Sequence, residues 1–217
     1  MDDLTTLQKL IVWAPPVLLA VTFHEVAHGW MARKLGDRTA EAQGRLSWNP
    51  LMHVDPIGTV LLPLFMLLTS GFIFGWAKPV PVSWGNLKSP RRDMALVALA
   101  GPAANLLMLI GWAVIVKWGM LLGDGQEFFA RPMVLMGLAG IMINSVLMIL
   151  NLFPLPPLDG SRLVSALLPA RWAWRYGQME PYGLIILVVL LVTGVLGQLI
   201  GPPIDFIHEV VGDVLRG

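Results

Sequence analysis

The stretch IVWAPPVLLAVTFHEVAHGWMARKLG, residues 11–36, places the pattern His24-Glu25-Val26-Ala27-His28 inside an apolar run. About 20 apolar residues suffice to cross the hydrocarbon core of a bilayer. Positions four apart in a helix share one face at about 6 Å, so both imidazoles can bind one metal ion. The intervening glutamate then points to a neighbouring angle that suits a general base. This stretch predicts a membrane helix that carries a zinc site.

The alternative reading of this pattern is a chance match, or polar groups that are satisfied within a protein core. Each polar group in a membrane helix costs several kcal/mol unless it is used. Two histidines and a glutamate on one turn would therefore be strongly unfavourable if they had no role. The metal site is the favoured interpretation.

The composition places the chain among polytopic membrane proteins. Its 217 residues are 56% hydrophobic and 13% charged, with a mean hydropathy of +0.69, whereas ordinary soluble domains are about 25% charged. The net charge of +1 gives no indication of nucleic-acid binding. Since cysteine is absent, a metal site must use histidine and carboxylate ligands. The N-terminus lacks the basic start and cleavage site of a signal peptide, so we expect the first apolar run to be retained.

Five apolar segments follow one another along the chain. They lie at residues 8–32, 57–74, 94–121, 132–153 and 182–200. Four of them are long enough to span, and the second is marginal because Pro63 and two glycines interrupt it. No repeat or separate soluble region is visible. We expect one domain over residues 1–217, all-α, with about four transmembrane helices and a short amphipathic helix in the tail.

Basic residues indicate how the second segment, 57–74, is placed. Groups of arginine and lysine precede it and follow it: Arg33, Lys34, Arg38 and Arg45 before, Lys78, Lys88, Arg91 and Arg92 after. A full crossing would put one of two equally basic loops outside, against the positive-inside tendency. The charges therefore favour a re-entrant segment over a fifth span.

Two stretches, 40–56 and 76–84, alternate in polarity and are rich in proline, glycine and tryptophan. This pattern is typical of extended edge segments. One hypothesis is that they form short membrane-associated β segments that offer an edge to a substrate strand. The equally supported alternative is that they are surface loops.

A third metal ligand is expected because catalytic zinc keeps three protein ligands and one open position. The residues left open as candidates are His53, Asp55, Asp159 and His208. Asp159 follows the run Asn151-Leu-Phe-Pro-Leu-Pro-Pro-Leu, whose prolines cannot continue a helix. Such a rigid turn can aim a carboxylate at a neighbouring helix. His53 is read equally well as a residue that supports the site and as part of a polar turn.

Together these motifs resemble the site-2 protease family of intramembrane zinc metalloproteases. That family pairs HExxH with an NxxPxPxxDG-type motif, represented here by Asn151, Pro154, Pro156, Asp159 and Gly160. It also has a Gly-Pro-x-x-Asn stretch on an intervening helix, here residues 101–105. The likeness covers roughly residues 10–170 and indicates a small bacterial-type branch, with no room in this chain for a PDZ or CBS domain.

The resemblance implies one Zn²⁺ per chain, bound by His24, His28 and Asp159. It makes Glu25 the catalytic base and gives Asn105 a role in holding the substrate or the oxyanion. The implied activity is an endopeptidase that cleaves single-span membrane proteins in or near their transmembrane helices, as in regulated intramembrane proteolysis. The alternatives are a metal-ion transporter and an inactive helix-binding scaffold.

The depth of the motif in the bilayer gives the expected location of the site. At 1.5 Å per residue from Ile11, His24 lies about 20 Å into a core of about 30 Å. With the N-terminus outside, the zinc is nearer the cytoplasmic face. By the resemblance, the setting is the inner membrane of a bacterium, with the lipid bilayer and membrane-protein substrates as partners and no nucleic acid.

Overall fold

The computed structural model describes residues 4–61, 78–122 and 126–217, and these residues are mostly helical. Three long helices form its centre: α1 (Thr6–Lys34), α4 (Pro90–Leu121) and α5 (Glu127–Leu152). Each is long and apolar enough to cross a membrane. The predicted spans at 8–32, 94–121 and 132–153 are therefore confirmed as helices, and the chain is a membrane protein.

The C-terminal part consists of four further helices. These are α6 (Asp159–Leu167), α7 (Ala170–Gly177), α8 (Glu180–Val192) and α9 (Val195–Arg216). The axes of α7 and α8 differ by 61°, and the pair counts as a fourth span if it is one bent segment. The predicted continuous helix over 182–200 is wrong, because Gly194 adopts φ +77° between α8 and α9. Residues other than glycine rarely take this conformation, which ends a helix.

The helices pack around a contact between α4 and α5, which α1 covers on one side and α9 on another. Glycines allow α4 and α5 to approach closely: a Cβ on Gly137 would overlap Val116. Ile207 and Val211 of α9 pack on a buried cluster that includes Val116. The predicted amphipathic tail is thus a helix, on which Val210 is 46% exposed.

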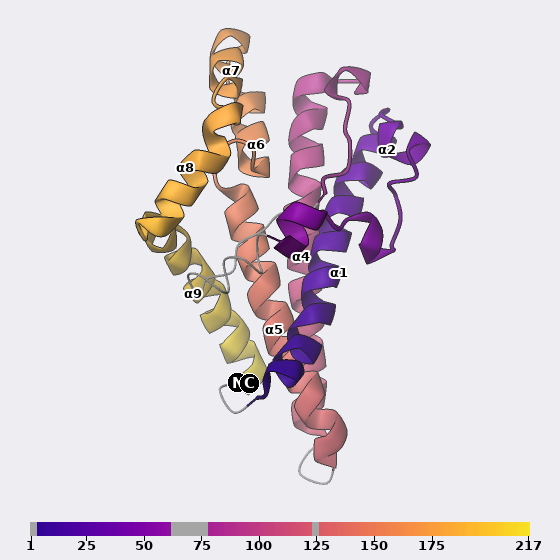
Figure 1. Ribbon diagram of the computed structural model, residues 1–217, viewed down its shortest axis with the longest axis vertical. Coiled ribbons are helices and arrows are strands. Elements are labelled where there is room, and N and C mark those ends of the chain that lie inside the picture. The colour runs from indigo at the N-terminus through magenta and orange to yellow at the C-terminus, as the bar shows by residue number, and fades with distance from the viewer. Residues whose placement is uncertain (1–3, 62–77, 123–125) are drawn as a thin grey trace.

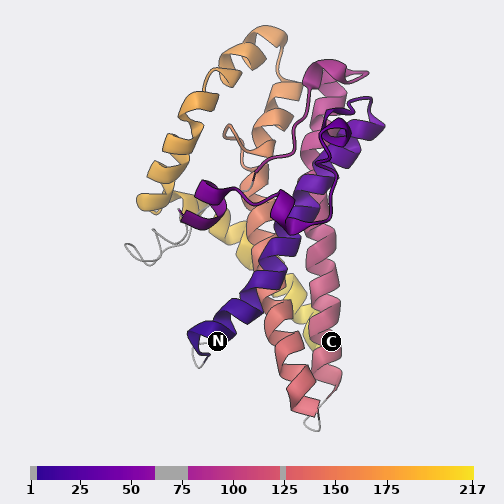
Figure 2. The same cartoon turned by 45° about the vertical axis from the view of Figure 1, so that its right-hand side comes forward.

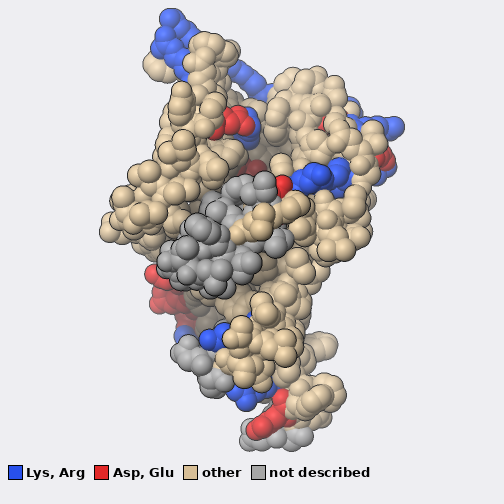
Figure 3. Space-filling view, viewed as in Figure 1, with Lys and Arg blue, Asp and Glu red and all other residues tan. Residues whose placement is uncertain are grey.

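Both ends of the chain lie toward the same end of the long axis, and α2 (Thr39–Ala42), α6 and α7 lie at the opposite end (Figures 1 and 2). The end of α1 and the approach to α4 meet there, since the Lys88 amide donates to the Leu35 carbonyl at 3.1 Å. Most of the face in Figure 3 is uncharged, as expected for a surface that contacts lipid.

Short helical turns, not strands, connect α1 to α4 in the part of the chain that the structure describes. They are α2, η1 (Pro50–Met52), the π-helical η2 (Pro56–Leu61) and η3 (Trp84–Asn86). The prediction of β segments at 40–56 and 76–84 is therefore wrong. Residues 78–83 run irregularly because scattered groups, not a neighbouring strand, bind their backbone. The Lys78 N–H donates to the His53 carbonyl at 2.9 Å, and Arg45 Nη2 donates to the Lys78 carbonyl at 3.0 Å. Prolines 79 and 81 also lack the donors that a ladder needs. Most of the segment 57–74 lies outside the described residues.

Candidate metal centre

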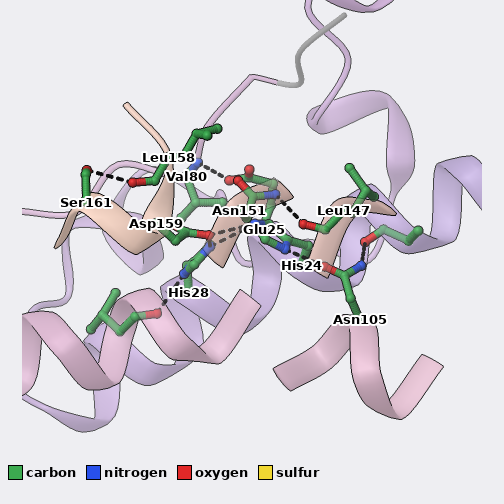
Figure 4. A network of polar contacts seen from close by, with 12 residues as sticks. His24, Glu25, His28, Val80, Asn105, Leu147, Asn151, Leu158, Asp159 and Ser161 are labelled. Carbon is green, nitrogen blue, oxygen red and sulfur yellow. Dashed lines mark hydrogen bonds and ion pairs between the residues drawn. The ribbon is translucent and has the colours of Figure 1, made fainter. Parts of the chain in front are cut away.

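Three potential ligand atoms converge between α1 and the first residue of α6. His24 and His28 lie one turn apart on α1, and their Nε2 atoms are 3.0 Å apart. Asp159 Oδ2 lies 3.3 Å from His24 Nε2 and 3.2 Å from His28 Nε2. Figure 4 shows the three side chains pointing toward one another. Of the four residues open as third ligand, the structure brings only Asp159 into the described metal-ligating cluster.

The other ring nitrogen of each histidine has its own partner. His24 Nδ1 lies 2.7 Å from Asn105 Oδ1, and His28 Nδ1 lies 2.7 Å from the Val97 carbonyl oxygen. Both partners are on α4, and both accept hydrogen bonds. Each Nδ1 therefore carries the proton, which leaves a lone pair on each Nε2 that faces Asp159.

This donor set fits a zinc ion. With the Nδ1 atoms protonated, two imidazole lone pairs and a carboxylate oxygen face one another without a proton to bridge them. Asp159 Oδ2 is buried and has no hydrogen-bond partner of its own. Two ligands of one tetrahedral Zn²⁺ lie about 3.3 Å apart, given bond lengths of about 2.0–2.1 Å. The observed separations of 3.0–3.3 Å match this spacing.

Gly101 of α4 explains why the two histidines can sit so close to that helix. A Cβ at this position would overlap His28 Nε2 and His24 Cε1. Any larger residue would therefore push the ring tips away from the place where they meet. The glycine of the Gly-Pro-x-x-Asn stretch is thus a steric requirement of the metal centre.

The proline-containing loop delivers Asp159 at the beginning of α6. After α5 ends, Phe153 takes an extended conformation, and α6 begins at Asp159 itself. Gly160 follows because a Cβ there would overlap the Leu152 carbonyl of α5. Ser161 Oγ donates to the Leu158 carbonyl at 2.7 Å and closes the turn. The sequence motif is therefore a device that docks α6 against the end of α5.

The helices α7 and α8 brace this loop from outside. Tyr176 of α7 donates its hydroxyl to the Pro154 carbonyl at 2.8 Å. Gly183 of α8 lies against the Pro156 carbonyl so closely that a Cβ would overlap it. Arg162, one turn after Asp159, pairs with Glu180 at the start of α8 at 2.6 Å.

Glu25, between the two histidines in sequence, is held by the segment that precedes α4. Its Oε2 accepts a hydrogen bond from the Val80 backbone N–H at 2.7 Å. The carboxylate is partly exposed, and its Oε1 is the oxygen that this bond leaves free for a water. This is the geometry expected of a general base beside a metal.

Asp37 anchors the same segment at the end of α1. Its buried carboxylate accepts from the Ser83 N–H at 2.7 Å and from Asn86 Nδ2 at 3.0 Å. Burial raises the pKa of this carboxyl, but hydrogen bonds from Thr39, Asn86 and Ser83 outweigh burial and hold the pKa below its ordinary value. Asp37 thus stays ionised and ties the segment that carries Val80 to the helix that carries Glu25.

The remaining sequence candidates lie elsewhere. His53 is buried, and its Nε2 lies 2.9 Å from the Ser47 carbonyl. Asp55 Oδ1 accepts from the Gly58 N–H at 2.6 Å, as a capping residue does. Both residues thus serve local turns, which favours the structural reading of His53. His208 lies on α9, away from this cluster.

Three partners of the centre escaped the sequence reasoning. Val80 and Val97 act through backbone atoms, which leave no signal in their side chains. Asn144 is different: its amide lies in the middle of the apolar run 132–153. A lone buried amide in a membrane helix is costly, so this signal was present. The substrate-binding role of Asn105 stays a prediction; the structure places this residue, fully buried, beside His24.

An HExxH helix that carries a His₂Asp centre among membrane-spanning helices defines a membrane metalloprotease. The comparisons with known proteins agree. The chain is 40% identical to "Putative zinc metalloprotease YwhC" of Bacillus subtilis, over 82% of this chain and 78% of that protein. It is 30% identical to "Putative zinc metalloprotease Rip2" of Mycolicibacterium smegmatis, over 83% of this chain and 66% of that protein.

The likeness to YwhC extends over most of both chains, so this chain belongs to the zinc metalloprotease family that YwhC represents. A Rip2 of Mycobacterium tuberculosis is 26% identical over 81% of this chain and 64% of its own length. The chain thus spans about two thirds of the Rip2 proteins. No protein-family model and no solved structure matches it.

Proposed function

We propose that this chain is an intramembrane zinc endopeptidase of the site-2 protease type. It cleaves a peptide bond in or near a transmembrane helix of a membrane-protein substrate. The observation that carries the proposal is that Asp159, at the start of α6, converges with His24 and His28 of α1, a helix that is apolar enough to span a bilayer. The kinship with zinc metalloproteases supports the same reading.

In this proposal His24, His28 and Asp159 hold one zinc ion per chain. When bound, zinc supplies the Lewis acidity that makes water a nucleophile near neutral pH. Glu25 takes the proton of that water on Oε1 and passes it to the leaving amine. Val80 keeps Oε2 occupied, so the carboxylate presents a defined oxygen.

Asn105 is assigned a different role from the one its family resemblance implies. Its Oδ1 faces His24 Nδ1, and its Nδ2 donates to Asn144 Oδ1 at 2.9 Å. With both ends of the amide engaged and the side chain fully buried, Asn105 positions a metal ligand. Contact with the substrate or the oxyanion would require it to leave these partners.

The substrates are expected to be single-span membrane proteins whose helix unwinds locally before attack, because helical peptide bonds are shielded by their own hydrogen bonds. Cleavage of this kind is regulated intramembrane proteolysis. The basic residues around the end of α1 and the start of α4 favour a cytoplasmic position for that end, by the positive-inside tendency. The centre then lies nearer the cytoplasmic face of a bacterial cell membrane.

The test is cleavage of a helical membrane substrate by the purified protein in lipid, with zinc counted in each sample. We expect about one zinc per chain in the unmodified protein and in Glu25→Gln, with cleavage reduced about 10²–10⁴-fold in the variant. Glu41→Gln serves as the control, since Glu41 pairs with Arg33 away from the metal, and it should cleave normally.

Two results would overturn the proposal. Equal cleavage by Glu25→Gln would remove Glu25 from the chemistry. Bound zinc without cleavage in any sample, together with zinc flux across proteoliposomes, would establish a transporter in its place.

A further inference from the structure

Asn144 is a buried amide with two assigned partners in the middle of α5. Its side chain is completely inaccessible. Its Nδ2 donates to the Gly140 carbonyl one turn earlier at 2.8 Å, and its Oδ1 accepts from Asn105 Nδ2 at 2.9 Å. A buried amide without partners costs about 1–3 kcal/mol in proteins, so this pair of bonds fixes how Asn144 lies.

The Gly140 carbonyl determines which atom donates in each hydrogen bond of the series from Asn144 to His24. A carbonyl can only accept, so Asn144 must turn its NH₂ toward Gly140 and its oxygen toward Asn105. Asn105 must then turn its own NH₂ toward Asn144, at 2.9 Å, and toward the Ala20 carbonyl, which lies 3.4 Å from the same Nδ2. Its oxygen then faces His24. An oxygen in that place requires a proton on His24 Nδ1 and so frees His24 Nε2 to face Asp159.

The reverse orientation would disable the ligand. If Asn105 turned its NH₂ toward His24, Nδ1 would have to accept and the proton would move to Nε2. A protonated Nε2 cannot bind a metal. His28 needs no such relay, because its Nδ1 faces the Val97 carbonyl directly. The two histidines are therefore oriented differently. A backbone carbonyl orients His28 directly, whereas His24 is oriented by the amide of Asn105, which bonds to Asn144 at 2.9 Å and more weakly to the Ala20 carbonyl at 3.4 Å.

We propose that Asn144 is a positioning residue of the metal centre, which sets the tautomer of His24 through Asn105. The inference rests on the proposed role of His24 as a zinc ligand. Asn144 does not touch the metal or the substrate. Two side chains, Asn105 and His24, lie between it and the metal. Outer partners of metal ligands typically contribute 10- to 100-fold to metal affinity.

The experiment measures zinc affinity by competition with a chelator, in protein kept in lipid and checked by thermal unfolding. Asn144→Leu removes both hydrogen bonds at similar volume and should weaken zinc binding about 10- to 100-fold. Asn144→Asp, protonated in this buried place, can donate to Gly140 and accept from Asn105, and should bind within a few-fold of the unmodified protein. Ser145→Ala is the matched control: Ser145 is equally buried and bonds only to the Ile141 carbonyl.

A second measurement separates positioning from a general loss of structure. In an Asn105→Ala background, the hydrogen-bonded link between Asn144 and His24 is already absent. Asn144→Leu should then cost no further zinc affinity, and the absorption of Co²⁺-substituted protein should match that of Asn105→Ala alone. If Asn144→Leu does not fold, Asn144→Ala takes its place in both measurements.

Zinc affinity in folded Asn144→Leu within twofold of the unmodified protein would overturn the inference. So would an undiminished loss in the Asn105→Ala background. An unmodified protein that binds no zinc would instead overturn the proposed function itself, and the two failures are therefore distinguishable.

Discussion

The two histidines of the proposed metal centre and Glu25, the proposed base, are held by two different kinds of structure. His24 and His28 are oriented by groups on α4, a long helix packed against α1 and α5. Glu25, on the same turn of α1, is held by a single backbone N–H from an irregular, proline-containing segment. The contacts with α4 orient the two histidines, whereas the contact with Val80 orients the carboxylate of Glu25. Metal binding and proton transfer should therefore respond separately to substitution.

The largest effect is expected from the ligand that the loop after α5 delivers. Asp159→Asn replaces a carboxylate that has no other hydrogen-bond partner at Oδ2 and should abolish both stoichiometric zinc binding and cleavage. Metal analysis of the purified protein checks this. Asp93→Asn is the control, because this buried aspartate bonds to Ser89 and Arg92 at the start of α4, away from the three ligands. Retained zinc in Asp159→Asn would show that the ligand set is wrong.

Gly101→Ala probes the packing of α4 against the two histidines without changing any ligand. The new Cβ would overlap both ring tips, so zinc affinity should fall at least about tenfold, as for loss of an outer partner. Gly111→Ala, on the same helix with open space around it, should leave zinc affinity unchanged. Equal affinities in a chelator titration of the two variants would contradict the close packing of α1 on α4.

Val80→Pro tests the contact between the loop and Glu25, since it removes the N–H that binds Glu25. A hydrogen bond to a charged group is worth about 1.5–3 kcal/mol, so cleavage should slow about 10- to 100-fold while zinc content stays the same. Val80→Ala keeps the N–H and should cleave at nearly the normal rate. If Val80→Pro loses zinc as well, metal binding and proton transfer are coupled and the distinction between them fails.

The smallest effect concerns Asp37, which ties the segment that carries Val80 to α1. An ordinary aspartate titrates near pH 3.9, and the pKa of Asp37 is lowered in the folded protein. Its contribution to stability is therefore present above about pH 4 and is lost as the pH falls through the folded-state pKa. Thermal unfolding of Asp37→Asn should show a lower midpoint at pH 7, with the difference from the unmodified protein shrinking below pH 4. A constant difference at all pH values would remove the carboxylate from this role.

The sequence predicts the placement of His24, His28 and Asp159 far better than the path of residues 78–83, for a physical reason. Histidines spaced four apart, the run of prolines before Asp159 and Gly101 are local patterns whose geometry follows from helix periodicity and sterics. The path of residues 78–83 is set by distant side chains such as Arg45 and Asp37, and no local pattern encodes it. The alternation in polarity of that stretch predicted strands wrongly, because the pattern does not reveal which groups hydrogen-bond to the backbone.

The end of the fifth apolar segment shows a similar limit. Hydropathy alone favours one helix over 182–200, because Gly194 does not interrupt the apolar character of this run. Its backbone conformation separates α8 from α9 and lets Ile207 and Val211 return to the core. Asn144, by contrast, could have been identified from sequence, since an amide in an apolar helix calls for a partner.

The bracing of the Asp159 loop by α7 and α8 has a practical consequence for anyone who purifies this protein. Among the helices, α8 makes its main contact with α9. It reaches the loop through Gly183, against the Pro156 carbonyl, and through Leu187, which packs with Leu155, while its Glu180 pairs with Arg162 of α6. A detergent that strips annular lipid and loosens α8 would release Asp159 while α1, α4 and α5 stay packed. Such a preparation would look folded by its helical content and yet be depleted of metal. Zinc per chain, measured after each step, is the criterion by which to choose a detergent.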